Sequence, residues 1–211
     1  MITRRLLLAA TGAAWVVPEA VFAASPAVIT MLGDSITAGL GLAAKDALPA
    51  QLQDSLNGLG VAAVVRAAGV SGDTTAGALA RLDFSVQADT HLCIVELGGN
   101  DYLQSVDPRQ IRANLTQISK RLKTRGIKVM ILGGHVPQAG GGAYSKAFDL
   151  AYAGAAKDTG ATLLPNFLNG VLDKPGLRQA DGIHPNAAGV KILAAQLVTA
   201  VVKVLAPGKA R

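Results

Sequence analysis

The chain has 211 residues, of which 50% are hydrophobic and 16% are charged, and its formal net charge is +6. This composition predicts one globular domain with a full hydrophobic core and excludes an intrinsically disordered chain. The positive charge does not indicate a nucleic-acid-binding protein, because no nucleic-acid-binding motif accompanies it and aromatic residues make up only 4% of the chain. The densest basic stretch, 120–128, ends a predicted helix, where cations suit the helix dipole.

The first 23 residues have the pattern of an export signal. Arg4-Arg5 supply a positive start, an apolar run covers 6–17, and Val21-Phe22-Ala23 offers a cleavage site. The run is shorter than the roughly 20 residues that span a membrane, which favours a cleaved signal peptide over an uncleaved anchor. The paired arginines also fit a twin-arginine signal. We therefore expect residues 24–211 to form a single domain that is periplasmic or secreted.

Strand-like and helix-like segments alternate along the rest of the chain. Hydrophobic patterns predict strands at 28–32, 61–65, 92–97, 128–132 and 161–164, and helices at 48–59, 74–82, 108–126, 144–157 and 190–204. The third of these helices has the clearest boundary, because Asp107 can cap it and Pro108 can be its first residue. The repeated order of strand and helix predicts an α/β fold with a parallel sheet covered by helices on both faces.

Three of the predicted strands end in polar turns that contain glycine. These turns are Gly33-Asp34-Ser35, Gly69-Val70-Ser71-Gly72-Asp73-Thr74 and Gly98-Gly99-Asn100-Asp101. Turn chemistry alone explains each of them, with Ser71 or Asp73 as a helix cap in the second. Parallel strands place their carboxyl ends at one edge, where such sheets bind ligands, so we expect the turns to converge. Ser35 is then a candidate nucleophile.

The three histidines differ in their surroundings. His91 begins the third strand, at the opposite edge, and is expected to be structural. His135 follows the fourth strand and can line a site, but no carboxylate lies near it in the sequence. His184 follows Asp181 by three residues in a tight turn. This spacing lets the carboxylate bind one ring nitrogen while the other nitrogen faces a serine.

A zinc site is the competing interpretation of Asp181 and His184. Zinc would need further histidine, cysteine or carboxylate ligands at suitable spacing, and the chain has one cysteine and scattered histidines. That cysteine, Cys93, lies in an apolar strand and is expected to be buried and unreactive. We expect neither a metal nor a cofactor.

The four motifs together resemble the SGNH hydrolases, a branch of the GDSL esterases and lipases. They are Gly-Asp-Ser at Ser35, the glycine Gly72, Gly-Gly-Asn-Asp at Asn100 and Asp-Gly-Ile-His-Pro at His184, in the order of the family. The wider stretches around the last three are similar to the periplasmic thioesterase I, lysophospholipase L1 and arylesterase group. One departure is Ile36, where the family name has leucine.

The resemblance implies a three-layer α/β/α sandwich with a flavodoxin-like, five-stranded parallel sheet. It implies a monomeric serine hydrolase of small acyl esters or thioesters, a membrane lipid among them, with no cofactor. Ser35 would be the nucleophile, His184 the base and Asp181 its partner. The backbone N–H groups of Ser35 and Gly72 and the amide of Asn100 would form the oxyanion hole.

The substrate remains open from the sequence. Asp34, Asp73 and His135 are candidate substrate-binding residues, although Asp34 is also expected to brace the turn of the nucleophile. The resemblance places the loop 135–144 at the border of the acyl pocket, so it leaves chain-length preference undecided. A carbohydrate O-acetyl esterase of the same fold is an alternative, although the few aromatic residues argue against sugar binding. A non-catalytic exported binding domain is a second alternative.

Overall fold

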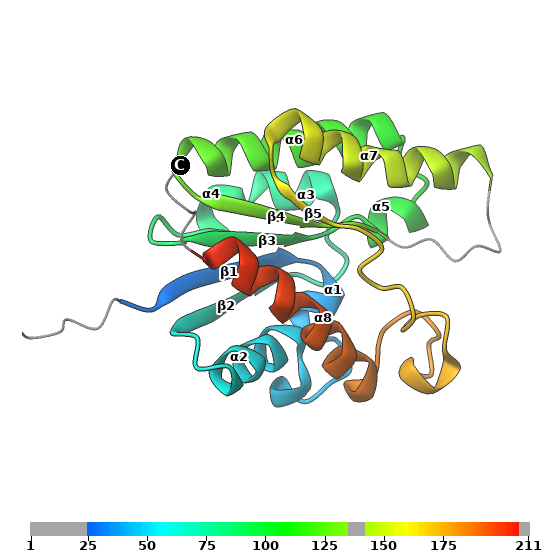
Figure 1. Ribbon diagram of the computed structural model, residues 1–211. Helices are drawn as coiled ribbons and strands as arrows, with labels where there is room; N and C mark the ends of the chain where they lie inside the picture. The colour runs from blue at the N-terminus through cyan, green and yellow to red at the C-terminus, as the bar shows by residue number, and fades with distance from the viewer. Residues whose placement is uncertain (1–24, 135–141, 207–211) are drawn as a thin grey trace, which may run out of the picture.

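The computed structural model describes residues 25–134 and 142–206. At its centre lies a parallel five-stranded sheet with the strand order β2-β1-β3-β4-β5 (Figure 1). The strands are β1 (Ala27–Gly33), β2 (Ala63–Gly69), β3 (Leu92–Glu96), β4 (Lys128–Leu132) and β5 (Thr162–Leu164). This order is that of flavodoxin-like sheets, and it confirms the predicted fold. The predicted signal peptide, residues 1–23, lies outside the described residues.

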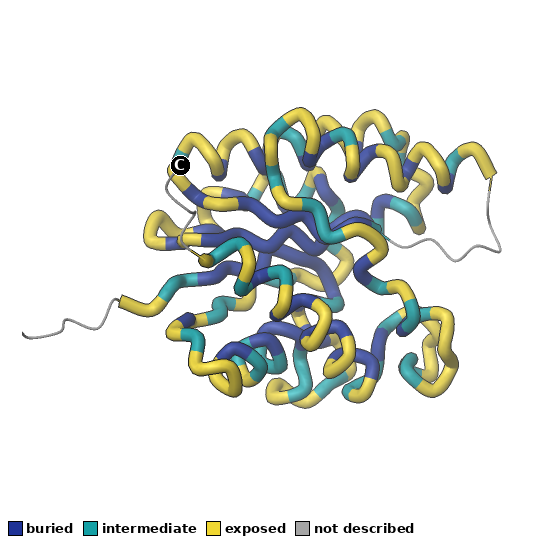
Figure 2. The backbone as a smooth tube through the Cα atoms, viewed as in Figure 1, coloured by how far each residue is buried: buried dark blue, intermediate teal, exposed yellow. Residues whose placement is uncertain are grey.

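Helices cover both faces of the sheet, as expected for parallel strands (Figure 1). One face carries α2 (Leu48–Gly58) and α8 (Ala187–Leu205), whose apolar side chains pack with those of β1, β3 and β4. The other carries α3 (Thr75–Ala80), α6 (Pro108–Thr124) and α7 (Ala143–Thr159). Figure 2 shows the three central strands, β1, β3 and β4, largely buried between these two layers. Cys93 is buried in the second layer, as predicted.

The start of α6 follows its predicted cap. The Asp107 carboxylate accepts a hydrogen bond from the backbone N–H of Arg109, and Pro108 is the first helical residue. A buried stripe of Ile111, Leu115, Ile118 and Leu122 then faces the sheet. Local chemistry therefore sets both the boundary and the orientation of this helix.

Two predicted elements differ from the structure. Strand β2 runs from 63 to 69 rather than from 61 to 65, because Ala67, Ala68 and Gly69 pair with the end of β1 although they carry little apolar signal. The helix predicted at 74–82 is divided into α3 and α4 (Leu82–Ser85). Arg81 lies between them and donates to the carbonyl oxygens of Gly33 and Ala68, which holds it at the edge of the sheet.

The remaining short helices lie in the connections. They are α1 (Ser35–Ala38), α5 (Gly99–Leu103) and the 3-10 helices η1 (Ala44–Asp46) and η3 (Pro175–Leu177). Among the described residues, α8 is the one helix long and apolar enough to cross a membrane. Its side chains Val190, Leu193 and Leu197 are fully buried against the sheet layer. In this fold α8 is therefore a core helix.

Candidate active site

A cavity of about 410 Å³ lies at the carboxyl edge of the sheet. Ser35, Gly72 and Asn100, which follow three different strands, all line it, and so does His184 from the loop before α8. The polar turns predicted to converge therefore do so. The rest of the wall is largely apolar and includes Leu97, Tyr102, Leu103, Leu132, Phe148, Phe167, Leu168, Leu172 and Ile183.

Ser35 is the first residue of α1 and follows β1 through a tight turn. The Asp34 carboxylate caps this helix by accepting from the backbone N–H of Ile36 at 3.0 Å. A side chain at Gly33 would lie 2.0 Å from the Thr37 hydroxyl oxygen and 2.8 Å from the Glu96 carbonyl oxygen, so only glycine fits there. The turn leaves the hydroxyl of Ser35 facing the cavity while the residue is 8% exposed.

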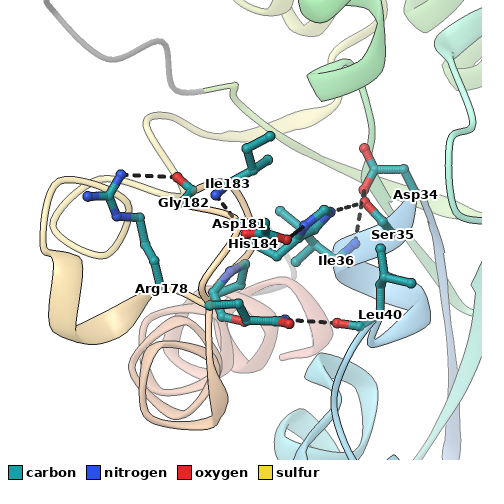
Figure 3. A network of polar contacts seen from close by, with 11 residues as sticks. Asp34, Ser35, Ile36, Leu40, Arg178, Asp181, Gly182, Ile183 and His184 are labelled. Atoms are coloured by element: carbon teal, nitrogen blue, oxygen red, sulfur yellow. Dashed lines mark hydrogen bonds and ion pairs between the residues drawn. The ribbon is translucent and has the colours of Figure 1, made fainter.

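Ser35, His184 and Asp181 form a continuous line of hydrogen bonds (Figure 3). Ser35 Oγ lies 2.8 Å from His184 Nε2, and His184 Nδ1 lies 2.6 Å from Asp181 Oδ2. Asp181 Oδ1 accepts from the backbone N–H groups of Ile183 and His184. These backbone bonds, together with the imidazole, lower the pKa of Asp181 from 3.8 to about 2. The carboxylate is therefore ionised across the neutral range.

The loop that carries His184 is fixed at both ends. Arg178 and Pro185 form an antiparallel bridge, and the Gln179 N–H donates to the His184 carbonyl oxygen at 2.8 Å. The Gln179 side chain also donates to the Leu40 carbonyl oxygen at 2.8 Å, just beyond α1. This bond ties the loop to the turn of Ser35, so the two reacting groups are held in one frame.

The predicted anion-binding donors surround the same cavity. Gly72 has a φ of +83°, which favours glycine, and apart from its chain neighbours no described residue has a heavy atom within 4 Å of the position a Cβ would take. Asn100 Nδ2 lies 2.8 Å from the Asp73 carbonyl oxygen and 3.3 Å from Asp34 Oδ2. The amide of Asn100 is thus oriented by two acceptors beside Ser35.

The three candidate substrate-binding residues have different positions. Asp34 lines the cavity and is 3% exposed; burial raises its pKa, and its bonds brace Ser35, Ile36 and Asn100. The described lining does not include Asp73, whose carboxylate instead forms an ion pair with Arg81 at 2.7 Å. The structure gives no support to substrate binding by the Asp73 side chain. His135 lies outside the described residues.

Glu96 is a cavity residue that belongs to none of the predicted site motifs. It ends β3, is 6% exposed, and accepts from the Thr37 hydroxyl at 2.8 Å. Burial raises the pKa of Glu96 well above its usual range, and the charge of Asp34 adds to this effect. The signal was present in the sequence, since Glu96 is the one charged residue in an otherwise apolar strand.

Asp101 has a structural position although it neighbours Asn100. Its buried carboxylate accepts from the backbone N–H of Thr75 at 2.8 Å and from the Thr75 hydroxyl at 2.6 Å. Asn114 of α6 donates to the same hydroxyl at 3.0 Å. These bonds join the start of α3 to α5 and α6. One motif thus supplies Asn100 to the cavity and Asp101 to the packing beneath it.

The remaining candidates have no place in the cavity. His91 accepts from the Val28 N–H through Nδ1 at 3.0 Å, at the amino end of the sheet, which confirms its structural role. Burial raises the pKa of Cys93 to about 12, so this thiol is unreactive at neutral pH. Among residues 25–134 and 142–206 no group of three or more histidine, cysteine or carboxylate side chains can hold a metal ion.

A buried serine hydroxyl in line with an imidazole and a carboxylate is the arrangement typical of serine hydrolases. Comparison with known proteins agrees with this class. Residues 31–192 match the model of the GDSL-like lipase/acylhydrolase family. The chain is 40% identical over 161 residues to Esterase TesA of Pseudomonas aeruginosa, covering 76% of this chain and 80% of that protein.

Two further comparisons extend over similar lengths. The chain is 38% identical over 165 residues to thioesterase 1/protease 1/lysophospholipase L1 of Escherichia coli K12, covering 78% of each chain. A crystal structure of TesA superposes with a TM-score of 0.81 at 37% identity, covering 84% of this chain and 99% of that one. The chain belongs to the GDSL-like lipase/acylhydrolase family. The prediction of an ester-hydrolysing enzyme is thereby confirmed.

Proposed function

We propose that this enzyme hydrolyses acyl esters and thioesters through a covalent acyl-enzyme on Ser35. The observation that carries the proposal is the 2.8 Å contact between Ser35 Oγ and His184 Nε2, with Asp181 bound to the other ring nitrogen. Neutral His184 takes the proton of Ser35 while Oγ attacks the carbonyl carbon. The protonated imidazole then gives this proton to the departing alcohol or thiol, and water repeats the sequence to release the acid.

His184 and Asp181 have separate tasks in this reaction. Proton transfer by a positioned imidazole contributes about 10²–10⁴-fold in rate. Asp181 holds His184 in the tautomer with its proton on Nδ1 and balances the charge of the imidazolium. Because its pKa is lowered to about 2, it performs this task at any pH at which His184 can act as a base.

The oxyanion hole of the proposal consists of the backbone N–H groups of Ser35 and Gly72 and the amide of Asn100. All three residues line the cavity at the carboxyl edge. The absence of a side chain at Gly72 allows the substrate oxygen to approach its N–H. The Asp73 carbonyl oxygen holds one N–H of the Asn100 amide at 2.8 Å, and the other N–H, which makes the longer 3.3 Å contact with Asp34 Oδ2, turns to the substrate oxygen.

The apolar lining of the cavity supports the proposal that the acyl group of the substrate binds there. Tyr102 and Phe148 pack edge to face, with ring centroids 5.4 Å apart, and offer an apolar surface next to Leu97. The names of the relatives, an esterase and a thioesterase/lysophospholipase, support oxygen and sulfur esters as substrates. We also propose that the enzyme is exported; the arginine pair and apolar run of residues 1–23 support this.

Hydrolysis of p-nitrophenyl butyrate tests the proposed reaction. We expect Ser35→Ala and His184→Ala each to lose nearly all turnover while far-UV circular dichroism stays unchanged. If Ser35→Ala kept a turnover close to that of the wild-type enzyme, Ser35 would be excluded as the nucleophile. Cell fractionation of the full chain, with and without residues 1–23, tests export; a cytoplasmic full-length chain would contradict it.

A further inference from the structure

Arg178 differs from the other arginines that the structure describes. Six of them form ion pairs with aspartates, namely Arg66, Arg81, Arg109, Arg112, Arg121 and Arg125. Arg178 has no ion pair within the described part of the chain. It is also the one lysine or arginine among the described residues that line the cavity.

The guanidinium of Arg178 has unused hydrogen-bonding capacity. Nη1 donates to the Gly182 carbonyl oxygen at 3.0 Å, whereas Nε is buried and has no hydrogen-bond partner among the described residues. A buried donor without an acceptor destabilises the fold, because it has lost its hydrogen bonds to water and forms none within the protein. Nε is out of reach of a ligand, but Nη2 makes no hydrogen bond with a described residue and is not among the buried atoms, so it is free to donate to an acceptor that enters the cavity. A guanidinium has a planar set of donors that matches the oxygens of a phosphate.

Arg178 lies on the side of the cavity where a leaving group would depart. It is in the same loop as His184, and its backbone forms a bridge with Pro185. His184 must reach the leaving atom to protonate it, so the leaving group extends toward this loop. In Figure 3 the guanidinium lies beside Gly182, at the far end of the loop from the contact between His184 and Ser35. It can contact a distal part of the leaving group but not the reacting carbonyl.

We propose that Arg178 binds a phosphate carried by the leaving group of the substrate. The proposal rests on the acyl-transfer function described above and specifies its substrate class. The acyl chain occupies the apolar wall at Tyr102 and Phe148, and the phosphate of the departing alcohol or thiol meets the guanidinium. Two kinds of molecule carry this chemistry, namely acyl-coenzyme A and lysophospholipids.

Matched substrate pairs test the charge preference. Butyryl-coenzyme A and S-butyryl-N-acetylcysteamine share the acyl group and the thioester, but only the first carries phosphate. 1-Lauroyl-lysophosphatidylglycerol and 1-monolauroylglycerol form the equivalent ester pair. In Arg178→Gln we expect the ratio of kcat/KM for the charged over the neutral member to fall about tenfold, the value of one charge-assisted hydrogen bond.

Arg66→Gln is the matched control. It removes the same charge from an arginine that is paired with Asp89, 40% exposed and outside the cavity lining. We expect it to leave both ratios within about twofold, since surface pairs have small effects. A drop in the thioester pair alone would assign the site to coenzyme A, and a drop in the ester pair alone to a lipid headgroup. Unchanged ratios in both pairs, or an equal drop in Arg66→Gln, would overturn the proposal.

A binding measurement separates this inference from the proposed reaction. Calorimetry of coenzyme A and of glycerophosphoglycerol with Ser35→Ala gives two dissociation constants that need no turnover. Adding Arg178→Gln should weaken at least one of them about tenfold. If both constants stay the same, the phosphate site is excluded even where the enzyme is active. If one weakens although the wild-type enzyme hydrolyses neither member of either substrate pair, the site holds and the proposed reaction fails.

Discussion

His184 Nε2 lies 2.8 Å from Ser35 Oγ, although the two residues are 149 positions apart in the chain. Two separate sets of local bonds make this contact. Asp34 fixes the Ser35 turn through the Ile36 N–H, and Asp181 fixes the His184 turn through two backbone N–H groups. The bond from Gln179 to the Leu40 carbonyl oxygen then joins the turns. The geometry thus depends on hydrogen bonds within and between the two loops that carry Ser35 and His184.

Removing the Asn100 amide should lower kcat far more than it changes KM. The proposed donor acts on the oxyanion, which exists only in the transition state, and losing one such donor costs about 3 kcal/mol. We expect Asn100→Ala to lose about 10²–10³-fold in kcat toward p-nitrophenyl butyrate. Steady-state kinetics provide the check. An increase in KM with unchanged kcat would mean that Asn100 binds the ground state instead.

Asp101 should affect stability rather than chemistry. Asp101→Ala leaves the backbone N–H and the hydroxyl of Thr75 without their buried acceptor. Two unsatisfied groups predict a loss of about 2–4 kcal/mol in the free energy of unfolding. Urea denaturation measures this loss, with Asn100→Ala as the neighbouring comparison. A loss no greater than that of Asn100→Ala would contradict the structural role of Asp101.

Acidic pH should remove the contribution of Asp181 to stability. Its folded pKa of about 2 lies below the ordinary value of 3.8, so the ionised carboxylate favours the folded state. This contribution is complete above pH 3.8 and is lost as the pH falls toward 2. The difference in Tm between the wild-type enzyme and Asp181→Asn should therefore be constant at higher pH and shrink over this interval. A difference that stays constant throughout would contradict the assignment.

Phe148 should help to set the preference for acyl length. It is 1% exposed, lines the cavity and packs on Tyr152 with ring centroids 5.1 Å apart. Phe148→Leu enlarges the cavity and costs about 1–2 kcal/mol of stability through lost ring contacts. The ratio of kcat/KM for p-nitrophenyl dodecanoate over butyrate should rise. Phe84→Leu, which alters a side chain that is 87% exposed and outside the cavity lining, should leave this ratio unchanged.

The sequence predicted those features that depend on local patterns. The order of strands and helices follows from hydrophobic periodicity, and the cap at Asp107 marks the start of α6. The spacing between Asp181 and His184 predicts their contact because both lie in one turn. Ser35 could be selected only through its motif and its place after β1, since no local signal shows which histidine faces it.

The features that local sequence patterns do not predict depend on contacts between distant segments. The Asp73 carboxylate is bound to Arg81, which lies eight positions later, at a bend that divided the predicted helix. Glu96 was visible as a charge in an apolar strand, but its partner Thr37 comes from another turn. Nothing in the sequence distinguishes Arg178 from the other arginines. Its lack of an ion pair can be recognised only once the structure shows where the aspartates lie.

Covalent labelling tests the central claim most directly. A fluorophosphonate reacts with an activated serine hydroxyl and remains attached, so the modified residue can be located by peptide mass spectrometry. The account predicts one adduct on Ser35 in the wild-type enzyme, strongly reduced labelling in His184→Ala and none in Ser35→Ala. An adduct on another serine, or an unlabelled enzyme that still hydrolyses p-nitrophenyl butyrate, would contradict it.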